Sequence, residues 1–97
     1  METAQSNPFI SDITKAAIKL LHGQLQELKE LFGERIDYAQ KVVEVAKRDY
    51  GLEITRSNVY STIGGYYKKP NTKVIRAIKT AFSEIREEYN ALAEILE

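Results

Sequence analysis

The last third of the chain carries a hydrophobic repeat that constrains its fold more than any other feature. Apolar residues recur at alternating spacings of four and three, the heptad pattern of an amphipathic helix. They are Ile78, Phe82, Ile85, Tyr89, Leu92 and Leu96. Asn71 precedes them, and its side chain can accept the unpaired amides of a first helical turn. The repeat therefore predicts a C-terminal helix of about 25 residues, roughly 37 Å long at 1.5 Å per residue.

A second apolar stripe lies near the N-terminus. Its members recur at spacings of three and four: Ile18, Leu21, Leu25, Leu28 and Phe32. Gly33 follows them and suits the left-handed conformation that ends many helices. Ser11 or Asp12 can cap the start of this helix. Residues 1–10 are polar, contain a proline and show no period, so we expect a flexible N-terminus there.

Two shorter helices are expected between the long ones. The first should start at residue 34 or 37 and end at residue 50, where Gly51 stops it. Its valines also allow a strand, but a lone strand would have no partner to satisfy its backbone. The second should span residues 55–63, with Val59 and Ile63 facing the core, before two glycines end it. The predicted fold class is all-α, with four helices in a helix-turn-helix domain.

The composition narrows the functional classes. Ninety-seven residues make one domain, expected over residues 11–97. The chain has no cysteine, one histidine (His22) and no glycine-rich phosphate loop, so no nucleophile–base pair or metal site can be assembled from it. We expect no enzyme, no cofactor, no metal and no small-molecule ligand. No apolar run approaches the roughly 20 residues that span a bilayer, and no signal peptide is evident. A cytoplasmic protein without a membrane partner is the expectation.

Charge is segregated along the chain, although the formal net charge is zero. No acidic residue occurs from Ile54 to Ser83, and acidic residues gather after this segment. The same segment holds six basic side chains and three tyrosines: Arg56, Lys68, Lys69, Lys73, Arg76, Lys79, Tyr60, Tyr66 and Tyr67. Such a basic segment in a neutral protein supplies the local field that attracts phosphate groups. We therefore expect double-stranded DNA as a partner.

The short helix at residues 55–63 is the predicted DNA-reading element. Its residues that are free to face outward are Arg56, Ser57, Asn58, Tyr60 and Ser61. Arginine can bond guanine and asparagine can bond adenine in the major groove, while serine hydroxyls suit phosphate oxygens. The residues that could hold the sugar-phosphate backbone follow directly: Tyr67, Lys68, Lys69 and Lys73. Alternatively, Tyr66 or Tyr67 fills space beneath the last helix.

The segment VYSTIGGYYKKPNTKVIRAIKTAF resembles the second half of the lambda-repressor-like (Cro/repressor type) helix-turn-helix domain. In that family an apolar residue of the recognition helix is followed six positions later by a glycine, then by a basic loop, a proline and an amphipathic helix. Val59, Gly65 and Pro70 follow this order, and the resemblance covers residues 50–85. The extended connection GLEIT departs from the family pattern. The resemblance implies that the basic loop, with Tyr67, Lys68 and Lys69, contacts phosphates. It also implies which residues face the major groove: Arg56, Ser57, Asn58, Tyr60 and Ser61.

The two long stripes could pack against each other within one chain. A helix of roughly 37 Å is longer than two short helices can cover, so we expect a homodimer through Ile78, Phe82, Ile85, Tyr89, Leu92 and Leu96. The first helix could contribute to that dimer. The predicted function is a homodimeric, sequence-specific DNA-binding transcriptional regulator. The alternative is a helical protein-interaction module, an assembly adaptor or antitoxin-like partner, that binds another chain through its leucine-rich stripes.

Overall fold

The computed structural model describes residues 8–67 and 69–96, and these residues form four helices and no strand. The helices are α1 (Pro8–Phe32), α2 (Tyr38–Tyr50), α3 (Arg56–Ile63) and α4 (Thr72–Ile95). The predicted all-α class is therefore confirmed, with long helices at both ends of the chain and two short helices between them.

The start of α1 differs from the prediction. The helix begins at Pro8, before either of the expected caps, Ser11 and Asp12. Proline suits the first turn of a helix because its φ angle is already helical and its missing N–H would have no acceptor there. Residues 8–10 of the segment expected to be flexible are thus part of α1, and residues 1–7 lie outside the described part of the chain.

Local capping sets the other helix starts. Asp37, Thr55 and Asn71 each accept a hydrogen bond from a backbone N–H of the following turn, at 2.8 to 3.2 Å. Gly51 ends α2 in the left-handed conformation, with a φ angle of 61°. These side chains replace helical hydrogen bonds that the first amides cannot make within the helix. The boundaries of α2, α3 and α4 therefore follow from the local sequence.

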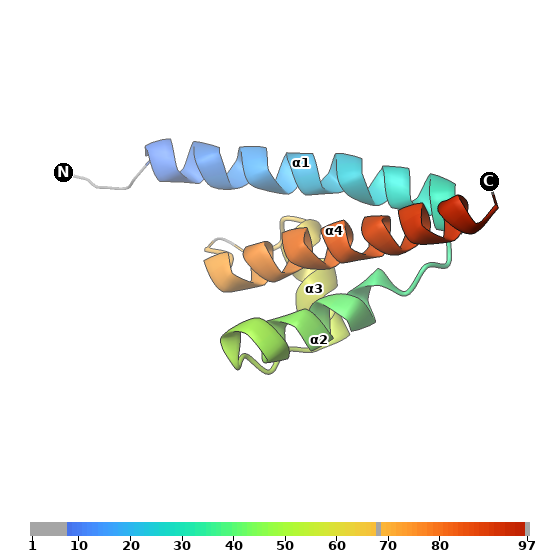
Figure 1. The fold of residues 1–97 in the computed structure, drawn as a ribbon. Coiled ribbons are helices and arrows are strands. Elements are labelled where there is room, and N and C mark those ends of the chain that lie inside the picture. The colour runs from blue at the N-terminus through green and yellow to red at the C-terminus, as the bar shows by residue number, and fades with distance from the viewer. Residues whose placement is uncertain (1–7, 68, 97) are drawn as a thin grey trace.

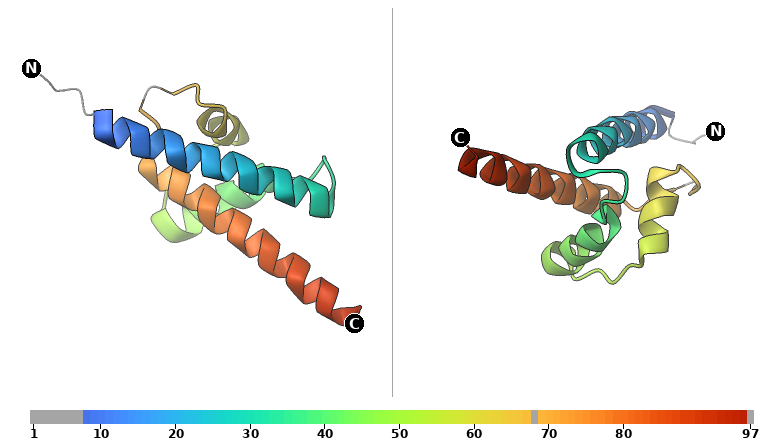
Figure 2. Two further views of the ribbon diagram at one scale, coloured as in Figure 1. Left: turned by 90° about the horizontal axis from the view of Figure 1, so that it is seen from above. Right: turned by 90° about the vertical axis from the view of Figure 1, so that its right-hand side faces the viewer.

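The core forms around α4. Figure 1 shows α4 between α1 and α2 with α3 crossing behind it, and the right-hand view of Figure 2 shows α3 closing one side of the bundle. The buried residues of α4 are Val74, Ala77, Ile78, Ala81, Phe82 and Ile85. They pack against Leu21, Leu25 and Leu28 of α1 and against the buried face of α2. Burial of this apolar surface is the main stabilising term of the fold.

The first half of the heptad stripe of α4 is buried within the chain. Ile78, Phe82 and Ile85 are 0%, 2% and 6% exposed. The expectation that these three residues form a dimer seam is therefore wrong, because α1 and α2 already cover them. Further along the stripe, Tyr89 is half-buried and its ring lies edge-on to that of Phe32 at a centroid distance of 5.7 Å. Leu92 and Leu96, the last members of the stripe, are exposed.

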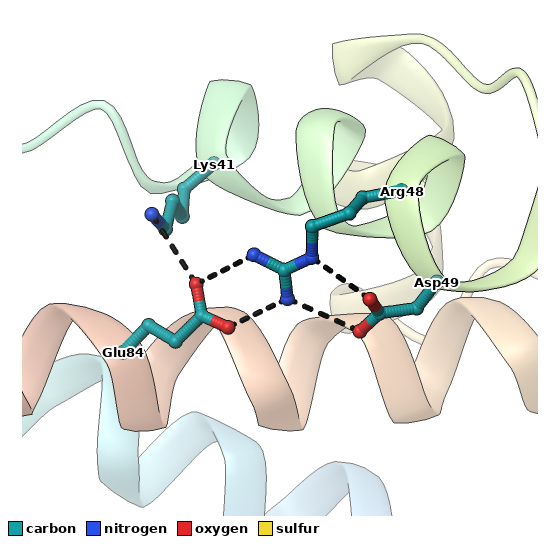
Figure 3. A network of polar contacts seen from close by, with 4 residues as sticks. All are labelled: Lys41, Arg48, Asp49 and Glu84. Carbon is teal, nitrogen blue, oxygen red and sulfur yellow. Dashed lines mark hydrogen bonds and ion pairs between the residues drawn. The ribbon is translucent and has the colours of Figure 1, made fainter.

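A polar network fastens α2 to α4 at the surface (Figure 3). Glu84 of α4 accepts two hydrogen bonds from the Arg48 guanidinium, at 2.6 and 3.1 Å, and pairs with Lys41 at 3.3 Å. Arg48 also donates to Asp49 at 2.8 and 3.1 Å. The hydrogen bond from Arg48, and then that from Lys41, lower the pKa of Glu84 below its ordinary value. The charged form of Glu84 is therefore favoured in the folded protein.

Candidate nucleic-acid interface

The reciprocal hydrogen bonds of a capping box begin α3. The Oγ1 of Thr55 accepts from the backbone N–H of Asn58 at 3.1 Å, and the Oδ1 of Asn58 accepts from the backbone N–H of Thr55 at 2.9 Å. The inward face of the helix is formed by Val59, Thr62 and Ile63, all buried. The predicted inward orientation of Val59 and Ile63 is confirmed, which fixes the face that α3 turns to solvent.

The solvent-facing side of α3 retains most of the predicted contact residues. Arg56, Ser57 and Tyr60 are exposed, and Ser61 is half-buried. The first turn of α3 contains no acidic side chain. The right-hand view of Figure 2 places α3 on the side of the molecule away from the C-terminal end of α4. The acidic half of α4 is thus remote from this face.

Asn58 is turned into the structure rather than outward. Its Oδ1 serves the capping box, and its Nδ2 donates to the Tyr67 hydroxyl at 3.0 Å. Both ends of the amide are therefore occupied, so the predicted contact of Asn58 with adenine is wrong for this conformation. The same bond gives Tyr67 a second role, because it tethers the loop after α3 to the start of that helix.

Arg56 forms a pair with Asp37, the residue that caps α2. Its Nη2 lies 2.7 Å from one carboxylate oxygen and its Nε lies 3.4 Å from the other. The hydrogen bond from Arg56 lowers the pKa of Asp37 most, and the hydrogen bond from the backbone N–H of Gln40 lowers it further. Both side chains remain about half exposed, at 51% and 55%. An ion pair this open to water is weak, so Arg56 can exchange Asp37 for another acceptor at small cost.

Aromatic contacts position Tyr60. Its ring lies edge-on to that of Tyr38 at 5.8 Å, and Tyr38 contacts Phe82 in the same way at 5.8 Å. Burial raises the pKa of Tyr38. Tyr60 itself is 49% exposed, so one edge of its ring is free. Tyr66 and Tyr67 are also exposed, which means that neither fills space beneath α4, the alternative considered for them.

Basic side chains lie on the loop after α3 and on the first half of α4. Lys69, Lys73, Arg76 and Lys79 are all exposed. Within residues 8–67 and 69–96, none of these four has a carboxylate oxygen within 4.0 Å. Lys68, the remaining predicted contact, lies outside the described residues. In this part of the chain the four cations can therefore meet an external anion without first breaking an ion pair.

A shallow cleft lies between α3 and the loop that carries Lys69. It has a volume of about 310 Å³ and an apolar floor that includes Leu52, Ile54 and Val74. Polar groups of Asn58, Tyr67, Lys69 and Asn71 form part of its lining. The structure thus brings the loop and α3 together as predicted. Sequence reasoning missed Asp37 and Tyr38, since their contacts with α3 join residues that are far apart in the chain.

The described residues show no metal-binding or membrane-spanning feature. They contain no group of three or more histidine, aspartate or glutamate side chains that could hold a metal ion. None of the helices in this part of the chain combines the length and the apolar character needed to cross a membrane. Comparison of the chain with protein-family models, with curated proteins and with solved structures found no match.

Proposed function

We propose that this protein is a sequence-specific DNA-binding regulator of the helix-turn-helix class. In this proposal α2 and α3 are the helix pair, residues 51–55 are their connection, and α3 enters the major groove. The observation that carries the proposal is a set of exposed cations on the loop after α3 and on the first half of α4 that have no carboxylate partner among the described residues: Lys69, Lys73, Arg76 and Lys79. These side chains would neutralise backbone phosphates and so supply the affinity that does not depend on sequence.

Base recognition would come from the exposed face of α3. This face includes Ser57 and Tyr60, and the half-buried Ser61 lies beside it. Arg56 lies at the edge of the face, where it forms the ion pair with Asp37. Arginine can hold the O6 and N7 atoms of guanine with two parallel hydrogen bonds, which is the same geometry that it now offers to a carboxylate. Arg56 would therefore exchange Asp37 for a base. Asn58 and Tyr67 would keep the helix and the loop in register.

Binding to random-sequence duplex DNA at about 50 and 200 mM salt, followed by selection of enriched sites, tests the proposal. Lys73→Ala should weaken binding to all sequences alike. It should also make the plot of log affinity against log salt concentration less steep, by about 0.9 for each phosphate that is no longer neutralised. Between about 50 and 200 mM salt, the variant should therefore lose roughly threefold less affinity than the natural chain for each such phosphate. Arg86→Ala is the matched control, because it also removes one positive charge but lies 13 residues further along α4, roughly 20 Å away. Equal effects of the two substitutions, or no binding at low salt, would contradict the proposal.

The alternative, a protein-interaction module, keeps one supporting observation. Leu92, Ile95 and Leu96 at the end of α4 are 58%, 78% and 88% exposed. Much of the other leucine-rich surface is buried inside the chain, because Leu21, Leu25 and Leu28 are part of the core. This alternative predicts that Lys73→Ala has no effect on binding to the partner, so the same variant separates the two functions.

A further inference from the structure

The outer face of α1 carries a hollow that the described part of the chain leaves open. Its lining residues are Ala16, Lys19, Leu20, Gly23, Gln24 and Glu27. Gly23 leaves room at its centre, since a Cβ atom at that position would meet no atom within 4 Å. Leu20 beside it is 58% exposed, and Ile13 is 53% exposed two turns earlier. A glycine in a helix interior is unfavourable by itself, so a packing role would explain its presence.

We propose that α1 of a second copy of this chain occupies this hollow in the antiparallel direction. The lining residues map onto themselves when the direction of the helix is reversed: Ala16 lies opposite Glu27, Lys19 opposite Gln24, and Leu20 opposite Gly23. Leu20 of each copy then enters the space above Gly23 of the other. A contact of this kind has two-fold symmetry and closes on itself as a dimer.

The charges on this face complement each other in that register. Glu27 of the second copy lies one helical turn from the position opposite Lys19, within reach of the long lysine side chain, and symmetry forms this pair twice. The Glu27 carboxylate already meets Arg86 of its own chain at 2.7 Å, so it would be shared between two cations. The side chain of Gln24 could accept a further hydrogen bond across the dimer. Its Oε1 is buried without a partner among the described residues, and Lys19 of the second copy can donate to it once the amide turns outward.

The exposed apolar end of α4 is a poorer place for self-association. Glu87, Glu88 and Glu94 are all exposed beside Leu92 and Leu96. A second copy would bring the same acidic groups together, and like charges at an interface are destabilising. The sign of the charges therefore selects the α1 face as the surface for a second copy.

The position of α3 leaves this face of α1 open. His22 of α1 lines a pocket with the C-terminal end of α3, and at about 100° per residue it lies roughly 140–160° around α1 from Leu20 and Glu27. A second copy on the outer face of α1 would therefore not displace α3. The pairing does not rest on DNA binding and is tested without DNA.

Sedimentation equilibrium over a range of protein concentrations tests the dimer. We expect a mass of twice 11.1 kDa for the natural chain, and 11.1 kDa for Leu20→Asp. Leu92→Asp is the matched control, because Leu92 is also 58% exposed, and it should leave the dimer intact. A natural chain that stays monomeric, or a dimer that Leu92→Asp dissociates and Leu20→Asp does not, overturns the proposal.

Gly23→Gln separates loss of pairing from loss of folding. Glutamine is a better helix former than glycine and fills the hollow, so the dimer should dissociate while the helical circular dichroism and the thermal midpoint of the dilute monomer do not fall. If Gly23→Gln dimerises like the natural chain, Leu20 does not occupy the space above Gly23 and the register is wrong.

Exchanged charges test the register directly. Lys19→Glu and Glu27→Lys should each weaken the homodimer by about tenfold, because each places like charges opposite one another. An equimolar mixture of the two variants should recover the association. In the mixed dimer the introduced carboxylate at position 19 meets the introduced ammonium at position 27, and the natural Lys19 and Glu27 meet at the symmetric position. A mixture that associates no better than either variant alone rules out this antiparallel pairing.

Discussion

Replacement of Asn58 by alanine separates a structural role of this residue from a DNA-reading role. The substitution removes the Oδ1 acceptor of the capping box and the Nδ2 bond to the Tyr67 hydroxyl. Each partly exposed hydrogen bond contributes about 0.5–1.5 kcal/mol. Without both bonds the free energy of unfolding should fall by about 1.5 kcal/mol, which corresponds to a fall of roughly 6–12 °C in the thermal midpoint for a domain of this size. Urea unfolding followed by circular dichroism measures the change.

Two further variants divide this effect between the bonds. Asn58→Asp keeps an acceptor for the Thr55 amide but loses the donor to Tyr67, and Tyr67→Phe removes only the hydroxyl. Each should cost less than Asn58→Ala, and a double-mutant cycle between Asn58 and Tyr67 should show a positive coupling energy of about 0.5–1 kcal/mol. If Asn58→Ala left the stability unchanged and altered only the preferred DNA sequence, the amide would face outward in solution, and that outcome would refute the structural role.

Other substitutions have consequences that the geometry fixes equally well. Gly51→Ala should lower the unfolding free energy by about 1–2 kcal/mol because its φ angle is 61°, whereas Gly51→Asn should cost less, as thermal unfolding will show. Leu28→Ala should cost about 3 kcal/mol because this side chain is 2% exposed, and the exposed Leu92→Ala should change stability by less than about 0.5 kcal/mol in the same urea assay. The lowered pKa of Glu84 stabilises the fold above the ordinary glutamate pKa near 4.5, and this contribution disappears as the pH falls through the lower folded value. Urea unfolding between about pH 6 and pH 3 should therefore show a steeper loss for the natural chain than for Glu84→Gln; parallel curves would show that Arg48 does not favour the charged carboxylate.

The helices could be predicted well from the sequence because their boundaries are local events. Asn71 acts as the expected cap, and Gly51 ends α2 as expected. A capping side chain needs only the next few amides, so its effect can be inferred from neighbouring residues. The start of α1 was harder to predict because Pro8 is ambiguous: a proline is common in irregular segments and also suits the first turn of a helix.

The heptad stripe shows what a hydrophobic period can predict and what it cannot. The spacing of Ile78, Phe82 and Ile85 identified a face that is buried, which the structure confirms. A period does not say which element covers that face, and here α1 and α2 do so within one chain. For these three residues the stripe therefore predicted burial correctly and the covering partner incorrectly.

The candidate site was predicted in outline. The exposure of Arg56, Ser57 and Tyr60 follows from the inward orientation of Val59, which helical spacing gives directly. The engagement of Asn58 could not be foreseen in the same way. Its partner Tyr67 lies beyond the end of the helix, and the contact depends on how the loop folds back over α3.

One helix of this protein consists of two halves with different stability. Within α1, residues 12–20 include no buried side chain, whereas Leu21, Leu25 and Leu28 anchor the second half in the core. The first half can therefore fray at little cost, while the second half opens only when the core opens. Amide hydrogen exchange should be fast before Leu21 and slow after it in the isolated chain. A molecule that binds the outer face of α1 should therefore be detected as slower amide hydrogen exchange in that first half.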